Sequence, residues 1–300
     1  TDIGNYYGAG TSALNWKENK LGVNFTVGKS GQPATLNPVS TPPFFKLINE
    51  VKTGTVGSGD NVYAYSAPYS TEVFLRGTYG ADLKKTIEIS VPDPALDLAY
   101  ALAETLNKDS ILIADTIITA KRLMNMDSLS LMDGNRNIIL STKSPTLGQI
   151  VHWFNQKSIN LYGESLLKII GGISAMDFDT EDAADLVSKY WQNKLSIDPS
   201  AINTFDGSGL SPQNRVTTLA MGKIMQYAKT RPWYDEFQKS LPTINGTSMK
   251  SGTIGGVLGY TGYQKSSDGQ EYTFALLVNN YQGPAGQMRQ RMFKLLNVLK

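Results

Sequence analysis

The sequence predicts an α+β protein, in which an antiparallel sheet covered by helices is joined to a β-rich unit. Residues 1 to about 110 contain short alternating apolar runs separated by Gly, Asn, Ser and Pro, which is typical of strands. From about residue 143 the apolar residues recur with a helical period. The chain then ends in a glycine-rich hairpin and a helix, and this order favours an antiparallel sheet over a doubly wound parallel one.

In the first part, "SALNWKEN", "LGVNFTVG", "NVYAYS", "TEVFLRG" and "KKTIEISV" predict mostly strands, and "TPPFFKLINEV" (41–51) predicts one short helix. A longer helix is predicted for "PDPALDLAYALAETL" (92–106). Asp93 can cap it, and Pro94 suits its first turn. Three leucines then follow at helical spacing: Leu98, Leu102 and Leu106.

The second part begins with predicted helices in "SPTLGQIVHWFNQ", "DTEDAADLVSKYWQNKL" and "SPQNRVTTLAMGKIMQYAK". We expect Ser211 to cap the last of these, with Pro212 behind it. Two extended runs follow, and the Asp-Gly pair in the "KSSDGQ" that joins them predicts a hairpin. The closing helix carries one apolar stripe: Met288, Met292, Leu295, Leu296 and Leu299.

Composition excludes several function classes. The chain has 300 residues and a formal charge of +2, without the Lys/Arg cluster that a nucleic-acid partner requires. It has no cysteine, which removes thiol nucleophiles, disulfides and thiolate metal sites. Its single histidine, His152, has apolar neighbours and is expected to have a packing or helix-surface role. We therefore expect no metal and no cofactor. A lysine with a lowered pKa or a carboxylate must carry any acid–base chemistry near neutral pH.

No apolar run approaches the ~18 residues of a membrane helix, so no transmembrane segment is expected. The N-terminal "TDIGNYYGAG" has neither the basic start nor the apolar stretch of a signal peptide, and it lacks an initiator Met. These features are typical of a mature or trimmed chain.

Three segments contain residues suited to chemistry: "SIN" (158–160), "FDGSGLS" (205–211) and "MKSGTIGG" (249–256). Each alone also has a structural interpretation, since Ser158 can be an N-cap, "DGSGLS" a turn, and "KSG" the start of a strand. Ser251 and Thr253 are two residues apart, so both hydroxyls lie on one side of a strand and can reach a single bound group. The glycines leave room for a peptide to pair with that strand.

A Ser-x-Asn before a helix, followed some ninety residues later by Lys-[Ser/Thr]-Gly at a strand, is typical of the penicillin-recognising serine enzymes. The resemblance extends further along the chain. "GAGTSALNWKENKLGVNFTVG", "ISVPDPALDLAYALAETL", "NQKSINLYGESLLKIIGG", "FDGSGLSPQNRVT" and "KSGTIGGVLGYTGY" resemble, in that order, the D-alanyl-D-alanine carboxypeptidases of the type-4, or class C low-molecular-mass, penicillin-binding proteins. The resemblance covers essentially the whole chain.

This resemblance implies a penicillin-binding/β-lactamase-like transpeptidase domain with a β-rich inserted domain. Residues 1–20 and 116–300 would belong to the transpeptidase-like domain, and residues 21–115 to the insertion. It also implies a penicillin-sensitive serine DD-peptidase, either carboxypeptidase or endopeptidase, that is acylated by D-Ala-D-Ala peptides and then hydrolysed. Its partners would be peptidoglycan peptides and β-lactams, in the periplasm or another extracytoplasmic part of the bacterial cell envelope.

The resemblance also implies roles for individual residues. Ser158 would relay a proton towards the departing amine, Asn160 would bind the substrate amide, and Lys250 would hold positive charge near Ser158. The substrate-binding residues would be Ser251, Gly252 and Thr253, whose two hydroxyls would contact the terminal carboxylate. The family usually has Thr where this chain has Ser251, and the substitution keeps the hydroxyl.

The family's nucleophilic serine belongs to a Ser-x-x-Lys motif that lies well upstream of "GAGTSAL". Only "SLLK" (165–168) matches this pattern here. On a helical wheel, Glu164, Ser165 and Lys168 lie opposite the arc formed by Tyr162, Leu166, Leu167, Ile169 and Ile170, so we expect the first three to face water.

The chain is therefore expected to lack the acylating serine, to be inactive alone and to associate with a missing N-terminal fragment. The alternative is a non-catalytic peptidoglycan-binding relative with a degenerate site. A β-lactamase would need a deacylating water and base, for which no further motif is present.

Overall fold

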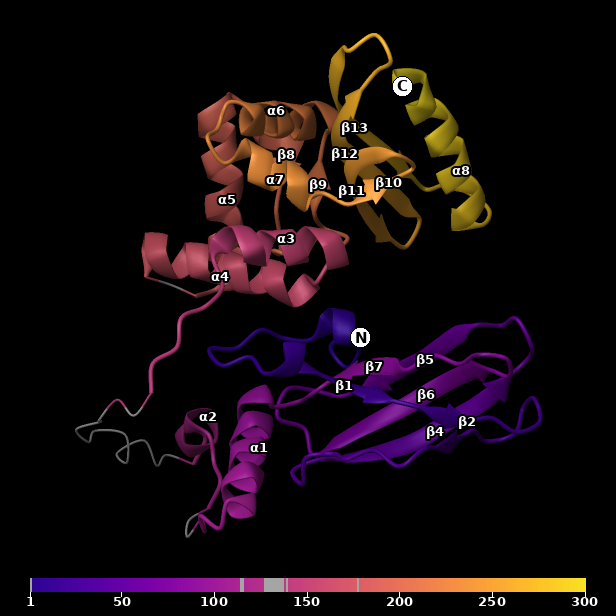
Figure 1. Ribbon diagram of the computed structural model, residues 1–300, viewed down its shortest axis with the longest axis vertical. Helices are drawn as coiled ribbons and strands as arrows, with labels where there is room; N and C mark the ends of the chain where they lie inside the picture. The colour runs from indigo at the N-terminus through magenta and orange to yellow at the C-terminus, as the bar shows by residue number, and fades with distance from the viewer. Residues whose placement is uncertain (1, 114–115, 127–137, 139, 177) are drawn as a thin grey trace. The chain divides into compact units, whose positions relative to one another are not determined.

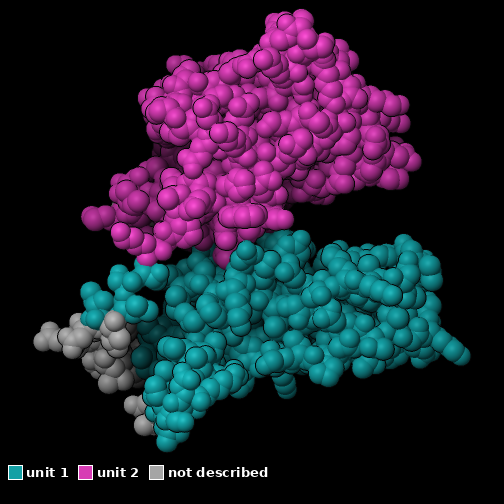
Figure 2. All heavy atoms as spheres, viewed as in Figure 1, with its two compact units in different colours: residues 1–142 teal, residues 143–300 magenta. Residues whose placement is uncertain are grey.

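The computed structural model divides into two compact units, residues 1–142 and 143–300, which are coloured separately in Figure 2. It describes residues 2–113, 116–126, 138, 140–176 and 178–300. The predicted boundary between the second and third segments of the chain falls at residues 114–115, which lie outside the described part. The assignment of the segments to an inserted and a transpeptidase-like domain stays a prediction.

The first unit is built on a three-stranded sheet of order β4-β6-β5, in which β4 and β6 are parallel and β5 is antiparallel to β6. Its strands are β1 (Lys20–Val23), β2 (Phe25–Thr26), β3 (Thr35–Leu36), β4 (Lys46–Gly54), β5 (Asp60–Tyr65), β6 (Glu72–Gly80) and β7 (Ile87–Ser90). One face of the sheet supplies the core of this unit through Val51, Val62, Ala64, Val73 and Leu75. Pairs β1-β7 and β2-β3 complete the β-rich part.

The helix predicted for residues 41–51 is wrong, because Lys46–Gly54 forms strand β4. This strand pairs with β6 along its whole length, from Lys46 opposite Glu72 to Gly54 opposite Gly80. Long-range pairing and burial of Val51 in the core outweigh local helix propensity at this position.

The helix predicted after the strands is confirmed as α1 (Pro94–Lys108). Its N-cap is Asp93, whose Oδ1 accepts from the amide of Leu96 at 3.0 Å, and Pro94 occupies the first turn. Asp93 is 1% exposed and also pairs with Arg122 on the short helix α2 (Ala120–Met124), with an Oδ2–Nε distance of 2.8 Å. Two 3-10 turns, Tyr6–Gly8 and Lys17–Asn19, precede β1, so the strand predicted for "SALNWKEN" is wrong.

The second unit contains an antiparallel sheet of order β10-β11-β12-β13. Its strands are β8 (Ile202–Asn203), β9 (Arg215–Val216), β10 (Thr243–Ile244), β11 (Thr247–Ile254), β12 (Val257–Lys265) and β13 (Glu271–Asn279). Its helices are α3 (Leu147–Lys157), α4 (Asn160–Ala175), α5 (Thr180–Leu195), α6 (Thr218–Lys229), α7 (Tyr234–Ser240) and α8 (Ala285–Leu296), with 3-10 turns at Pro199–Ala201 and Asn297–Leu299.

Helices cover both faces of this sheet (Figure 1). On one face, Met292 and Leu296 of α8 pack against Met249, Leu258 and Tyr260. On the other face, Tyr263 of β12 packs with Met225 of α6 and with Phe237 of α7. The structure therefore has the predicted α+β class, with an antiparallel sheet between helices and a closing hairpin at Asp268-Gly269.

The prediction that Ser211 caps the helix in 211–229 is wrong. Helix α6 begins at Thr218, and its cap is Thr217, whose hydroxyl accepts from the amide of Ala220 at 3.2 Å. Ser211 instead lies in a turn before β9. The residues of β9 lie between that turn and the helix, and they are extended because they pair with β8. None of the described helices is both long and apolar enough to cross a membrane.

Candidate active site

Ser158 forms the corner between α3 and α4. Its backbone has φ 53° and ψ 49°, the left-handed conformation, and it ends α3. Residues other than glycine adopt this conformation uncommonly, and such residues cluster at functional sites. The N-cap of α4 is Ile159, so the interpretation of Ser158 as a simple N-cap is wrong.

The Ser158 hydroxyl meets Lys250, which lies 92 residues further along the chain on β11. Lys250 Nζ donates to Ser158 Oγ at 2.8 Å and to the carbonyl oxygen of Ser251 at 2.7 Å. Met249, which is fully buried, packs towards α8, so the alternation of the strand directs Lys250 to the opposite face. Burial lowers the pKa of the Lys250 amine below its ordinary value of 10.5, because desolvation disfavours the charged form.

The buried amine predicts a pH-dependent gain in stability for Lys250→Met. Between the lowered pKa and 10.5 the unfolded chain binds more protons than the folded one, so the free energy of unfolding of the parent protein rises with pH there. The melting temperature of the variant should exceed that of the parent by a few degrees at neutral pH, and the difference should shrink as pH approaches 10.5.

Thermal melts between pH 6 and pH 10 test this prediction. Lys265→Met, which changes an exposed lysine at the end of β12, serves as the control. A gain for Lys250→Met that is the same at every pH would contradict the burial argument.

Ser251 and Thr253 lie opposite Tyr260 and Leu258 in the register of β11 and β12, so they share the side of the strand that carries Met249. Lys250 lies on the other side, so the structure does not bring these two hydroxyls onto the face where Lys250 meets Ser158. Strand β10 pairs only with Thr247 and Ser248. Beyond them, the edge of β11 that faces away from β12 has no strand partner among the described residues. The amide of Met249 points to this edge, since it donates to the carbonyl of Pro242 at 2.9 Å. By alternation the amides of Ser251 and Thr253 point to the same open edge.

Asn160 is the first residue of α4, and the loop 204–214 packs against the same part of the helix. Glu164, one turn after Asn160, accepts from the amides of Gly207 and Ser208 at 3.3 and 3.0 Å. The backbones of Gly163 and Gly207 also touch: a Cβ on Gly207 would lie 2.1 Å from the carbonyl oxygen of Gly163. Two glycines and one carboxylate therefore fix this loop against the first turns of α4.

The loop is also tied together internally by Asp206. Its carboxylate accepts from the amides of Gly209 and Ser211 at 2.6 and 2.5 Å, and from Asn214 Nδ2 at 2.9 Å. The "FDGSGLS" segment is therefore a tight turn held by its own aspartate, and it packs against α4 through Gly207 and Ser208.

The prediction that Glu164, Ser165 and Lys168 face water is wrong. Glu164, Ser165 and Lys168 are half-buried, whereas Ile169 and Ile170 are 49% and 41% exposed. Lys168 Nζ donates to the carbonyl of Phe178 and to Thr180 Oγ1, both at 2.8 Å, and neither bond joins it to Ser158 or Lys250. The prediction from the helical wheel failed because Lys168 and Glu164 have specific partners: the Phe178 carbonyl and the Thr180 hydroxyl for Lys168, and the amides of residues 207–208 for Glu164. Hydropathy alone does not reveal such partners.

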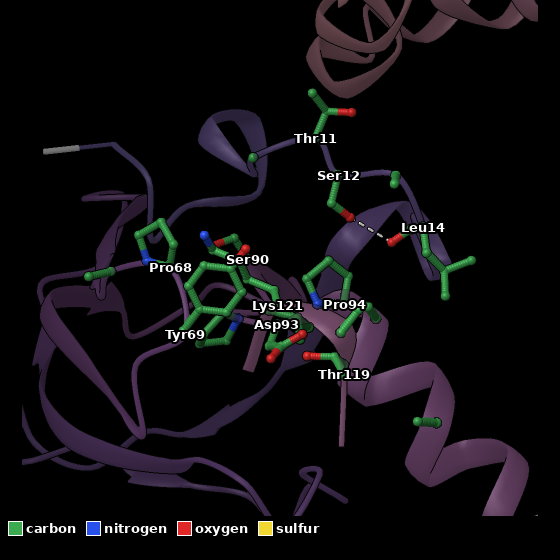
Figure 3. Close-up of a pocket in the computed structure, with 18 of the residues that line it drawn as sticks. Thr11, Ser12, Leu14, Pro68, Tyr69, Ser90, Asp93, Pro94, Thr119 and Lys121 are labelled. Carbon is green, nitrogen blue, oxygen red and sulfur yellow. Dashed lines mark hydrogen bonds between the residues drawn. The ribbon is translucent and has the colours of Figure 1, made fainter. Parts of the chain in front are cut away.

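A cavity of about 920 Å³ lies within the first unit (Figure 3). Most of its lining is apolar and rich in proline, with Tyr69 at one wall and the hydroxyl of Ser12 donating to the Leu14 carbonyl at its rim. Asp93, which lines it, is already engaged as the cap of α1 and the partner of Arg122. None of the residues that the sequence singled out for chemistry lines this cavity.

His152 is half-buried on α3 and packs edge-to-face on Trp153, with ring centroids 5.3 Å apart. In the described part of the chain, no three His, Asp or Glu side chains gather into a possible metal site.

Comparison with known proteins identifies relatives along the whole chain. A family model described as "D-Ala-D-Ala carboxypeptidase 3 (S13) family" matches residues 1–297. A D-alanyl-D-alanine carboxypeptidase of Actinomadura sp. (strain R39) is 25% identical over 286 residues, which cover 88% of this chain and 51% of the relative. A penicillin-sensitive carboxypeptidase A of Dictyostelium discoideum is 25% identical over 238 residues, which cover 70% of this chain and 43% of the relative. The chain thus spans about half the length of these curated relatives.

Among solved structures, penicillin binding protein 4 from Haemophilus influenzae superimposes with a TM-score of 0.69. The match has 16% sequence identity and covers 99% of this chain and 70% of that one. A complex of the same protein with a β-lactam gives a TM-score of 0.67, also at 16% identity, over 96% and 70% of the two chains. The predicted penicillin-binding fold is therefore confirmed.

Proposed function

Because the chain belongs to the D-Ala-D-Ala carboxypeptidase 3 (S13) family, we propose that the protein is a serine DD-peptidase acting on peptidoglycan stem peptides through an acyl-enzyme. Residues 143–300 would supply the proton-transfer and substrate-binding half of its active site. The observation that carries this proposal is the hydrogen bond of 2.8 Å from Lys250 Nζ to Ser158 Oγ. It joins two segments that the sequence had singled out independently for chemistry.

In the proposed reaction, a serine hydroxyl attacks the carbonyl carbon of the penultimate D-Ala and gives up its proton. The bond from that carbon to the nitrogen of the terminal D-Ala breaks, and the proton passes through the Ser158 hydroxyl to the departing amine. The positive charge of Lys250 holds the Ser158 oxygen in place and favours transfer of its proton to the amine. Water then hydrolyses the ester and regenerates the serine.

The substrate would be held by Asn160 and by strand β11. Asn160 binds the peptide amide of the substrate. The hydroxyls of Ser251 and Thr253 lie on the other side of β11 from Lys250 and would reach the terminal carboxylate only where the peptide lies along the edge of the strand. The open edge of β11 supports this assignment, since an extended peptide can add to an unpaired strand and the outward amides can bind a developing oxyanion. Gly252, without a side chain, leaves that edge accessible.

The acylating serine is assigned to a part of the protein outside these 300 residues. The only Ser-x-x-Lys sequence in the chain is Ser165–Lys168, and the Lys168 amine donates to the Phe178 carbonyl and to Thr180 Oγ1, away from the pair formed by Ser158 and Lys250. The second candidate function is a non-catalytic protein that binds the same peptides. In either case the partners would be peptidoglycan peptides and β-lactams, and the protein would work outside the cytoplasm in the cell envelope.

Labelling with a penicillin, followed by intact-mass measurement and peptide mapping, tests this proposal. We expect one adduct on the full-length protein, on a serine outside residues 1–300, and none on the 300-residue chain alone. If neither is labelled, the binding function replaces the enzymatic one. An adduct on Ser165 would show that the nucleophile had been assigned to the wrong part of the protein.

A further inference from the structure

A buried polar contact joins the end of α3 to the end of α7. Asn155 is 8% exposed and Ser240 is fully buried. Asn155 Nδ2 donates to Ser240 Oγ at 2.7 Å, and Ser240 Oγ donates to the carbonyl of Phe237 at 2.6 Å. The neighbouring Gln156 donates through Nε2 to the Ser240 carbonyl at 2.9 Å. Two consecutive side chains of α3 thus bind the same residue.

This contact links the segment that carries Ser158 to the segment that leads to Lys250. On α3, Asn155 precedes Ser158 by three residues. After Ser240, the chain returns to the start of β11, where the Met249 amide donates to the Pro242 carbonyl at 2.9 Å. Ser248 Oγ also donates to the carbonyl of Gln238 on α7 at 3.3 Å. The path from Ser158 to Lys250 therefore runs through Asn155, Ser240 and the first residues of β11.

We propose that Asn155 and Ser240 are positioning residues, which set the distance between the Ser158 hydroxyl and the Lys250 amine by fastening α3 to the segment that leads into β11. The inference rests on the proposed function and adds to it the element that aligns its proton-transfer pair. Ser158 is exposed on a left-handed corner, so the position of its oxygen depends on how α3 is held. A buried hydrogen bond between an amide and a hydroxyl suits this task, because breaking it leaves a polar group unsatisfied in the core.

The first test measures the rate of acylation by a fluorescent penicillin in the full-length protein. Ser240→Ala and Asn155→Ala should each slow acylation by roughly 10- to 100-fold, since misplacement by about 1 Å can cost that much. The double variant should be no slower than the slower single one, because both changes remove the same contact.

The matched control is Ser188→Ala on α5. Ser188 is also buried, at 3% exposure, and its hydroxyl accepts from the Thr204 amide at 2.9 Å. It should lower the melting temperature about as much as Ser240→Ala and leave acylation unchanged. A wild-type acylation rate in Ser240→Ala, or equal slowing in Ser188→Ala, would overturn the inference, since the contact would then be structural only.

A second readout needs no acylation. Titration of the Lys250 amine by NMR, with ¹³C at the lysine ε-carbon, reports whether the amine keeps its buried position. Ser240→Ala should raise the pKa of Lys250 towards its ordinary value by admitting water, and Ser188→Ala should not. If the unmodified protein is never acylated, the proposed function fails, while this titration still decides the inference.

If Ser240→Ala does not fold, Gln156→Ala tests the same link. It removes only the bond to the Ser240 carbonyl and should shift both readouts in the same direction by a smaller amount. A Gln156→Ala protein with unchanged acylation and an unchanged Lys250 titration would count against the inference.

Discussion

Lys250→Met in the full-length protein is expected to reduce acylation by penicillin by about 10²- to 10⁴-fold, which is the usual contribution of positioned acid–base groups. Methionine fills a similar volume but cannot donate to Ser158 Oγ, as Lys250 Nζ does at 2.8 Å. The Ser158 hydroxyl would lose both its fixed orientation and the neighbouring charge that favours proton transfer. Stopped-flow measurement of acyl-enzyme formation gives the rate directly.

Lys265→Met controls for the loss of one positive charge on the same sheet and should acylate at the parent rate. Because Lys250→Met is also predicted to melt at a higher temperature at neutral pH, a loss of acylation cannot be ascribed to unfolding. Acylation within about twofold of the parent would remove Lys250 from the mechanism and leave the peptide-binding function as the better account.

Local chemistry predicted the regular elements well. Asp93 and Pro94 marked the start of α1 in the sequence, because a short acceptor side chain and a fixed φ both favour the first helical turn. The Asp-Gly pair at 268–269 marked the closing hairpin in the same way. The fold class followed from the order of these elements, which is a property of the sequence alone.

The errors share a different cause, since each depended on a partner distant in the chain. Residues 46–54 became a strand because β6 pairs with them, and Ser211 was displaced as a cap because β9 pairs with β8. Glu164 is turned inwards by the amides of Gly207 and Ser208. None of these partners can be identified from local periodicity or propensity.

The site shows the same division between local and distant information. The sequence singled out Ser158, Asn160 and Lys250 as site residues, and the structure brings Ser158 and Lys250 into contact although they are 92 residues apart. It gave no sign that Ser158 is left-handed or that Asn155 and Ser240 join α3 to α7. The only local signal of the loop packed on α4 was the pair of glycines in "FDGSGLS", which the sequence interpretation assigned to a turn.

Gly207→Ala should strongly disturb the packing of the 204–214 loop on α4. The new Cβ would lie 2.1 Å from the carbonyl oxygen and 2.5 Å from the carbonyl carbon of Gly163, and neither backbone atom can rotate away. The loop must therefore leave α4, which breaks the bonds from its amides to Glu164. We expect a loss of about 1–3 kcal/mol or more in the free energy of unfolding, as for other overpacked contacts. Denaturant titration measures it.

Gly222→Ala is the matched control, because a Cβ on this residue of α6 meets nothing within 4 Å. The same substitution should there stabilise the protein by roughly 0.5–1 kcal/mol, since alanine loses less backbone entropy in a helix than glycine. If the loop supports the first turn of α4, Gly207→Ala should also slow acylation in the full-length protein, because Asn160 begins that turn. If Gly207→Ala unfolds at the same denaturant concentration as the parent, the loop and the helix separate easily. The close contact of Gly163 with Gly207 would then have no part in holding the Ser-x-Asn corner.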